Sequence, residues 1–67
     1  VILIARESRG SYKCSLRGSQ VRIDLILDQI LATVNGSGGG HEHACGAVIP
    51  SDEFAHFVEL LRAKVQE

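Results

Sequence analysis

The segment from residue 50 onward shows the pattern that most limits how this chain can fold. After Pro50, apolar side chains recur at intervals of three and four residues, at Phe54, Phe57, Val58, Leu61 and Val65. This spacing predicts an amphipathic α-helix that Ser51 caps. Such a helix must bury its apolar face against a second element. The rest of the chain must therefore provide an apolar surface for it.

Two runs near the start of the chain predict strands for that surface. Residues 1–5 are continuously apolar and rich in β-branched side chains, which is typical of a strand covered on both faces. Residues 6–11 are expected to turn the chain. Along residues 12–17 apolar and polar side chains alternate, which predicts a half-buried strand whose polar face presents Lys13, Ser15 and Arg17.

The middle of the chain predicts a second helix followed by a loop. Asp24 is a suitable N-cap for a helix that ends at Asn35 and Gly36, with apolar positions at Leu27, Ile30, Leu31 and Val34. We expect residues 37–40 to form a glycine-rich loop, residues 41–45 one helical turn and residues 47–49 a third strand. These elements predict an α+β fold in which a small mixed β-sheet of about three or more strands, in the order strand, strand, helix, strand, helix, packs against two helices.

Length and composition indicate one globular domain. The chain has 67 residues, 45% of them hydrophobic and 22% charged, which is ordinary for such a domain. It has no methionine and begins in a strand-like run, so we expect residues 1–67 to be one domain of a longer protein. It lacks the roughly 20 consecutive apolar residues of a membrane span, so we expect no membrane partner. Cys14 and Cys45 stand outside any C-x-x-C motif, which favours a cytoplasmic protein with free thiols.

Basic residues concentrate in the first third of the chain. The whole chain has a net charge of −1, but residues 1–22 contain a single acid, Glu7, and the cations Arg6, Arg9, Lys13, Arg17 and Arg22. We therefore expect an anionic ligand to bind there. A solvated basic strand face without a ligand is the alternative.

Three consecutive glycines precede a histidine at residues 38–41. Gly38, Gly39 and Gly40 have no Cβ, so a phosphate can approach the backbone N–H groups of this segment closely. His41 can donate a hydrogen bond to the same phosphate from a ring nitrogen. The alternative is a flexible connector whose histidine has no role.

Arg17 is the strongest candidate for a second contact to an anion. It lies between Ser15 and Ser19 and is followed by Gly18. A guanidinium recognises phosphate through two parallel hydrogen bonds, and hydroxyl groups can add to them. The alternative is an ordinary exposed arginine on a strand.

The sequence does not favour catalysis or metal binding within these residues. His41, Glu42, His43 and Cys45 are zinc-ligand types, but a structural zinc site usually draws a second pair from another segment, where only Cys14 stands. The serines lack the surroundings that activate a nucleophile. We therefore predict no catalytic residue, metal site or cofactor in this chain.

The spacing of these motifs resembles the DHH-associated domain, the C-terminal substrate-binding domain of DHH-family phosphoesterases. The resemblance covers nearly the whole chain and rests on Ser15-Leu16-Arg17, on Ile23-Asp24 opening a helix, and on Gly38-Gly39-Gly40-His41-x-x-Ala44-x-Gly46. Two positions depart from the family pattern. Cys45 stands where alanine is usual, and Gly18 stands where serine often follows the arginine.

The resemblance implies a function in nucleotide hydrolysis by a larger enzyme. The family includes RecJ-type single-strand exonucleases, oligoribonucleases, phosphatases of adenosine 3′,5′-bisphosphate and cyclic-dinucleotide phosphodiesterases. In these hydrolases a separate N-terminal DHH domain of the same chain binds manganese or magnesium. The resemblance also implies that Gly38, Gly39, Gly40 and His41 line the nucleotide cleft and that Arg17, with Ser15 or Ser19, contacts a phosphate.

We therefore expect a domain that binds a nucleotide or single-stranded nucleic acid and is inactive without its DHH domain. Two alternatives remain at this point. A similar domain ends many alanyl-tRNA synthetases, where its role is RNA binding without hydrolysis. A zinc-binding or purely structural interaction domain is the other.

Overall fold

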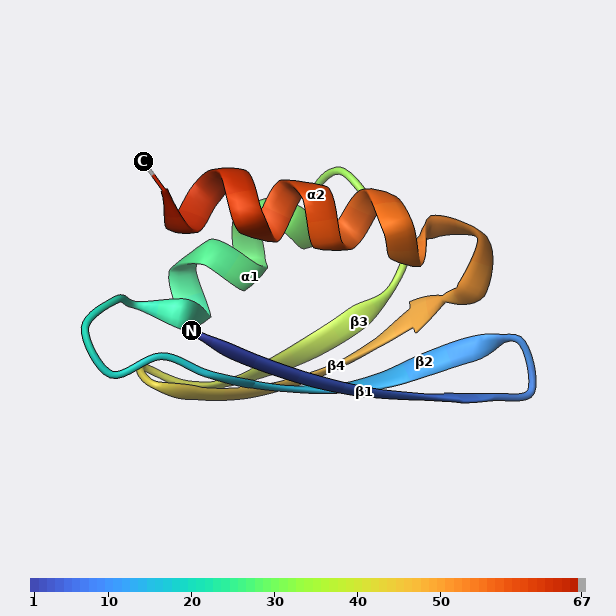
Figure 1. Cartoon of the computed structure of the whole chain (residues 1–67), viewed down its shortest axis with the longest axis horizontal. Coiled ribbons are helices and arrows are strands. Elements are labelled where there is room, and N and C mark those ends of the chain that lie inside the picture. The colour runs from blue at the N-terminus through green and yellow to red at the C-terminus, as the bar shows by residue number, and fades with distance from the viewer. Residues whose placement is uncertain (67) are drawn as a thin grey trace.

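The computed structural model describes residues 1–66 and has two layers (Figure 1). A four-stranded sheet forms one layer, and two helices cover one of its faces. The predicted α+β class is confirmed. The sheet is wholly antiparallel rather than mixed, because every strand pairs with its neighbours in the antiparallel sense.

The sheet is built from two hairpins. The first joins β1 (Ile2–Ser8) to β2 (Ser11–Arg17), and the second joins β3 (Ser37–His41) to β4 (Ala44–Pro50). The strand order is β1-β2-β4-β3, so β2 and β4 are central and the other two are edges.

The first hairpin turns on two residues, Arg9 and Gly10. Their φ angles are 53° and 82°, the positive values that suit a tight two-residue hairpin. The predicted turn over residues 6–11 was therefore too long. The expectation that residues 1–5 are covered on both faces was also wrong, because β1 is an edge strand on which Ile2 is 60% and Ile4 68% exposed.

The second hairpin replaces the predicted loop and helical turn. The glycine run forms β3, and residues 42 and 43 turn the chain into β4, which begins three residues before the predicted third strand. Glycine disfavours strands in general, but it is used where another backbone approaches closely. A Cβ at Gly38 would lie 2.9 Å from the Ala47 Cα, and one at Gly40 would lie 2.7 Å from the Cys45 Cα. These two glycines let β3 lie against β4.

The helices begin and end differently from the prediction. Helix α1 (Ile23–Leu31) has Asp24 in its first turn rather than as its cap, and buried Val34 lies beyond its end. A 3-10 turn, η1 (Ser51–Glu53), precedes α2 (Phe54–Val65). The Ser51 hydroxyl donates to the Glu7 carboxylate at 2.8 Å instead of capping a helix.

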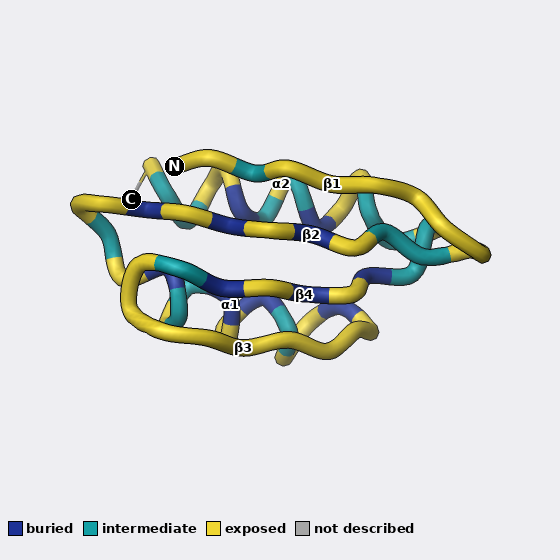
Figure 2. The backbone as a smooth tube through the Cα atoms, turned by 90° about the horizontal axis from the view of Figure 1, so that it is seen from below, coloured by how far each residue is buried: buried dark blue, intermediate teal, exposed yellow. Residues whose placement is uncertain are grey.

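The core lies between the sheet and the helices. Figure 2 shows buried residues alternating with exposed ones along β2 and β4. Tyr12 stacks on Phe54 with ring centroids 3.9 Å apart, so it belongs to the helix-covered side. Within residues 1–66 no helix combines the length and apolarity needed to cross a membrane. The core consists of Cys14, Leu16, Ile23, Leu27, Ile30, Val34, Cys45, Ala47, Ile49, Phe57 and Leu61.

Candidate functional site

The face of the sheet that no helix covers collects most of the predicted site residues. Strand side chains alternate between the two faces, and the register of the pairs assigns each residue to one of them. We call this uncovered side the open face. It comprises Ile2, Ile4, Arg6 and Ser8 of β1; Ser11, Lys13, Ser15 and Arg17 of β2; Ala44, Gly46, Val48 and Pro50 of β4; and Ser37, Gly39 and His41 of β3.

The register places Arg17 and His41 in one row across the sheet. Ala44 pairs with Arg17 on one side and with His41 on the other. The Cα atoms of Arg17 and His41 are thus two strand spacings apart, about 10 Å. In the next row Gly46 lies between Ser15 and Gly39. The side chains at the centre of these rows are the methyl group of Ala44 and the hydrogen of Gly46. A ligand can therefore reach the sheet between Arg17 and His41.

Three other predicted site residues lie elsewhere. Gly38 and Gly40 pair with Ala47 and Cys45, whose side chains are buried, so they belong to the helix-covered side. Ser19 lies beyond the end of β2, outside these rows. Among the three glycines, Gly39 alone belongs to the open face, and a Cβ there would meet nothing within 4 Å.

Backbone carbonyls hold the Arg17 side chain. Its Nη1 donates to the Leu16 oxygen at 2.8 Å and to the Cys45 oxygen at 3.3 Å. These bonds orient the guanidinium over the β2–β4 pair. Its other N–H groups make no hydrogen bond with residues 1–66. They can therefore donate to an anion.

The turn after His41 is attached to the segment after Arg17. The Gly18 N–H donates to the His43 oxygen at 3.1 Å, and the Ile23 N–H donates to the Glu42 oxygen at 3.0 Å. These bonds fix the tip of the second hairpin against the start of α1. The separation between Arg17 and His41 is therefore set by two groups of backbone contacts, the strand pairing through Ala44 and these bonds beyond the strand ends.

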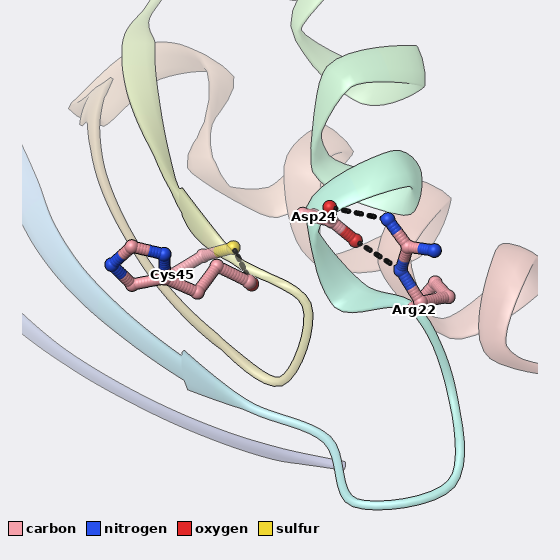
Figure 3. Close-up of polar contacts among 4 residues, drawn as sticks. Arg22, Asp24 and Cys45 are labelled. Carbon is pink, nitrogen blue, oxygen red and sulfur yellow. Dashed lines mark hydrogen bonds and ion pairs between the residues drawn. The ribbon is translucent and has the colours of Figure 1, made fainter.

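A hollow of about 620 Å³ lies between the start of α1 and the tip of the second hairpin, and His41 and Ala44 are among the residues that line it. Arg22 on its wall donates to both Asp24 oxygens, at 3.0 and 2.9 Å (Figure 3). The hydrogen bond from Arg22 lowers the pKa of the Asp24 carboxyl. Glu42 also lines the hollow, whereas the open face has no acidic side chain. An anion is therefore favoured on the open face.

Sequence reasoning gave no separate role to Ala44 and Gly46, which form the floor of the two rows. The sequence feature that could have indicated them is the small size of both residues at alternate positions. This feature is informative only once residues 44–50 are known to form a strand. Arg22 was counted as a cation of the basic third, but its charge is balanced by Asp24.

A comparison with protein-family models identifies the chain. The model of the DHHA1 domain matches residues 1–67. The chain belongs to the DHHA1 domain family. A search of curated proteins found no match. The match confirms the predicted resemblance over the whole chain.

The two cysteines of this DHHA1 domain are free and buried. The Cys45 thiol donates to the His41 carbonyl oxygen at 3.4 Å (Figure 3). Burial is the main reason that the pKa of the Cys45 thiol is raised, and it also raises that of Cys14. Both thiols therefore stay protonated near neutral pH, and Cys45 supports the strand that presents His41.

The described residues do not fit a metal centre. Within residues 1–66, no three side chains of the ligand-forming types His, Cys, Asp and Glu gather closely enough to hold an ion. Cys45 is buried in the core, away from the exposed side chains of His41 and His43. The zinc alternative thus lacks a ligand set here.

Adding one equivalent of zinc, or a strong chelator, is expected to leave the thermal midpoint of the DHHA1 domain unchanged. Structural zinc contributes directly to the free energy of folding, so its binding or removal shifts the midpoint. Differential scanning fluorimetry at neutral pH measures this. A rise of several degrees with zinc would show that the histidines and Cys45 rearrange into a metal site.

Proposed function

We propose that this DHHA1 domain binds the phosphate of a nucleotide or of single-stranded nucleic acid on its open face, between Arg17 and His41. The observation that supports this most is the shared row of Arg17, Ala44 and His41, with Gly39 beside it. It places a guanidinium and an imidazole on either side of a floor without bulky side chains. Such an arrangement suits a tetrahedral anion with several acceptor oxygens.

Charge favours the same ligand. The open face has three cationic side chains, Arg6, Lys13 and Arg17, and no carboxylate. A surface of one sign raises the local concentration of oppositely charged ligands. The phosphate contacts identify no base, because phosphate oxygens are the same in every nucleotide.

Each residue of the row has a distinct part in binding. Arg17, already oriented through Nη1, donates its remaining N–H groups to phosphate oxygens, and His41 donates from a ring nitrogen. Ser15 offers a hydroxyl in the next row. Gly39 leaves space for the ligand to approach the strand. In this proposal these groups hold and orient the phosphate, and none of them takes part in breaking the phosphodiester bond.

DHHA1 domains are associated with DHH-family phosphoesterases. We infer that hydrolysis occurs in an N-terminal DHH domain of the same protein. Manganese or magnesium bound there would activate the attacking water. The 67 residues alone are then catalytically inactive. A cytoplasmic location belongs to this proposal and is supported by the two free thiols.

Titration of the isotope-labelled DHHA1 domain with a mononucleotide tests the proposal. We expect shifts of the amides of residues 39–44 and of the Arg17 side-chain resonances. With a small ligand the dissociation constant should be near millimolar, about 4 kcal/mol of binding free energy. Shifts confined to α2, with a silent β3, would contradict the assignment.

A further inference from the structure

We propose that Arg6 and Lys13 form a second phosphate subsite on the open face, so that the ligand is an oligonucleotide strand rather than a mononucleotide. This inference rests on the proposed function, because it extends the same face. It concerns the end of the sheet away from Arg17 and His41.

Arg6 and Lys13 are directly opposite each other in the pairing of β1 with β2. The side chains of both residues are exposed. Cβ atoms of directly paired residues are about 5 Å apart, and like charges at that distance destabilise a sheet. The DHHA1 domain therefore accepts an electrostatic penalty at this position when no anion is bound.

No carboxylate of residues 1–66 relieves that penalty. Neither cation has an ion pair or hydrogen bond with a described residue. Glu7, the neighbouring acid, lies on the other side of β1 and accepts a hydrogen bond from Ser51. An anion from outside the chain would neutralise both cations at once.

The separation from the first subsite indicates the length of the ligand. Lys13 and Arg17 lie on the same face of β2, and four residues of an antiparallel strand span about 14 Å. A mononucleotide held by Arg17 and His41 leaves the pair of cations unoccupied. A chain of phosphodiesters carries regularly spaced charges and reaches both subsites.

Apolar side chains lie beside this path. Ile4 is 68% exposed in the row between the two subsites, and Val48 is 41% exposed next to Lys13. They offer a nonpolar surface for sugars and bases, with no donor or acceptor that reads a base edge. Binding should therefore depend on the length of the oligonucleotide far more than on its sequence.

The test compares thymidine monophosphate with an oligomer of about six thymidylates, a length within the usual range of single-strand sites. The double variant Arg6→Gln/Lys13→Gln should bind the oligomer about three- to tenfold more weakly, as expected for two exposed charge contacts. The slope of log affinity against log salt should fall by about 0.7 in magnitude, because the second subsite holds one phosphate and each phosphate neutralised on a single strand contributes about 0.7. Affinity for the monophosphate should be unchanged.

Three controls separate this effect from general charge, from misfolding and from the identity of the two cationic side chains. Arg62→Gln removes an exposed cation on α2, in the helix layer, and should leave binding of the oligomer as it was. The double variant should be at least as stable as the parent, because a like-charge pair is removed. The exchange variant Arg6→Lys/Lys13→Arg keeps both positive charges and should bind the oligomer with the affinity of the parent.

The outcomes distinguish this inference from the proposed function. If the double variant binds the oligomer with the parental affinity and salt slope while Arg17→Ala weakens it, the second subsite is wrong and the first stands. If neither the double variant nor Arg17→Ala weakens binding of the oligomer, the open face is not the nucleotide site and both proposals are wrong.

Discussion

Replacing Arg17 and His41 together with alanine is expected to weaken binding of a short oligothymidylate at least ten- to a hundredfold. A hydrogen bond to a charged group contributes about 1.5 to 3 kcal/mol, and 1.4 kcal/mol corresponds to a factor of ten. The two residues lie on either side of the same floor residue, Ala44, so one phosphate loses contacts on both sides. Fluorescence anisotropy with a labelled oligomer measures the loss.

The fold should survive these changes, because both side chains are exposed. The cost to stability is confined to the two bonds that Arg17 makes to the Leu16 and Cys45 carbonyls. Arg17→Lys should retain part of the affinity, since an ammonium keeps the charge but cannot hold two carbonyls and donate to a phosphate as a planar fork. Parental affinity in the double alanine variant would exclude the proposed function.

Alanine at Gly38 or at Gly40 should destabilise the domain by about 1 to 3 kcal/mol each, the usual cost of forcing atoms into a packed position. At Gly38 the new Cβ would lie 2.9 Å from the Cα and the Cβ of Ala47. At Gly40 it would meet the Ala44 carbonyl oxygen, and it would lie 2.7 Å from the Cys45 Cα. β3 could then no longer lie as close to β4. Urea denaturation followed by circular dichroism reports the change.

Gly39→Val is the matched comparison, because a Cβ at this position meets nothing within 4 Å. We expect stability close to that of the parent, since valine suits a strand. The side chain would stand on the open face beside His41 and obstruct the ligand, so oligonucleotide affinity should fall. Equal destabilisation by Gly39→Val and Gly38→Ala would show that the register of β3 is wrong.

Local patterns in the sequence were sufficient for part of the fold and part of the site. The stripe from Phe54 to Val65 predicted α2, whose Phe57 and Leu61 are buried. The alternation over residues 12–17 correctly placed Ser15 and Arg17 on one face of a strand. These predictions held because helix and strand periodicity is expressed within a single segment.

The role of the glycines could not be predicted in the same way. Glycine by itself favours turns and loops, which is why residues 37–40 were expected to be a loop. Their strand exists because β4 pairs with it, and its register assigns Gly38 and Gly40 to contact with β4 and Gly39 to the open face.

The sequence by itself determined which segments are amphipathic, where cations concentrate and which family the motifs resemble. Only the tertiary structure decided which of these residues meet. Arg17 and His41 share a row, and Arg6 faces Lys13, because strands far apart in the chain or joined by a turn adopt one register. The exposure of β1 follows from its place at the edge of the sheet. Register and strand order depend on packing between segments, which no local pattern of side chains specifies.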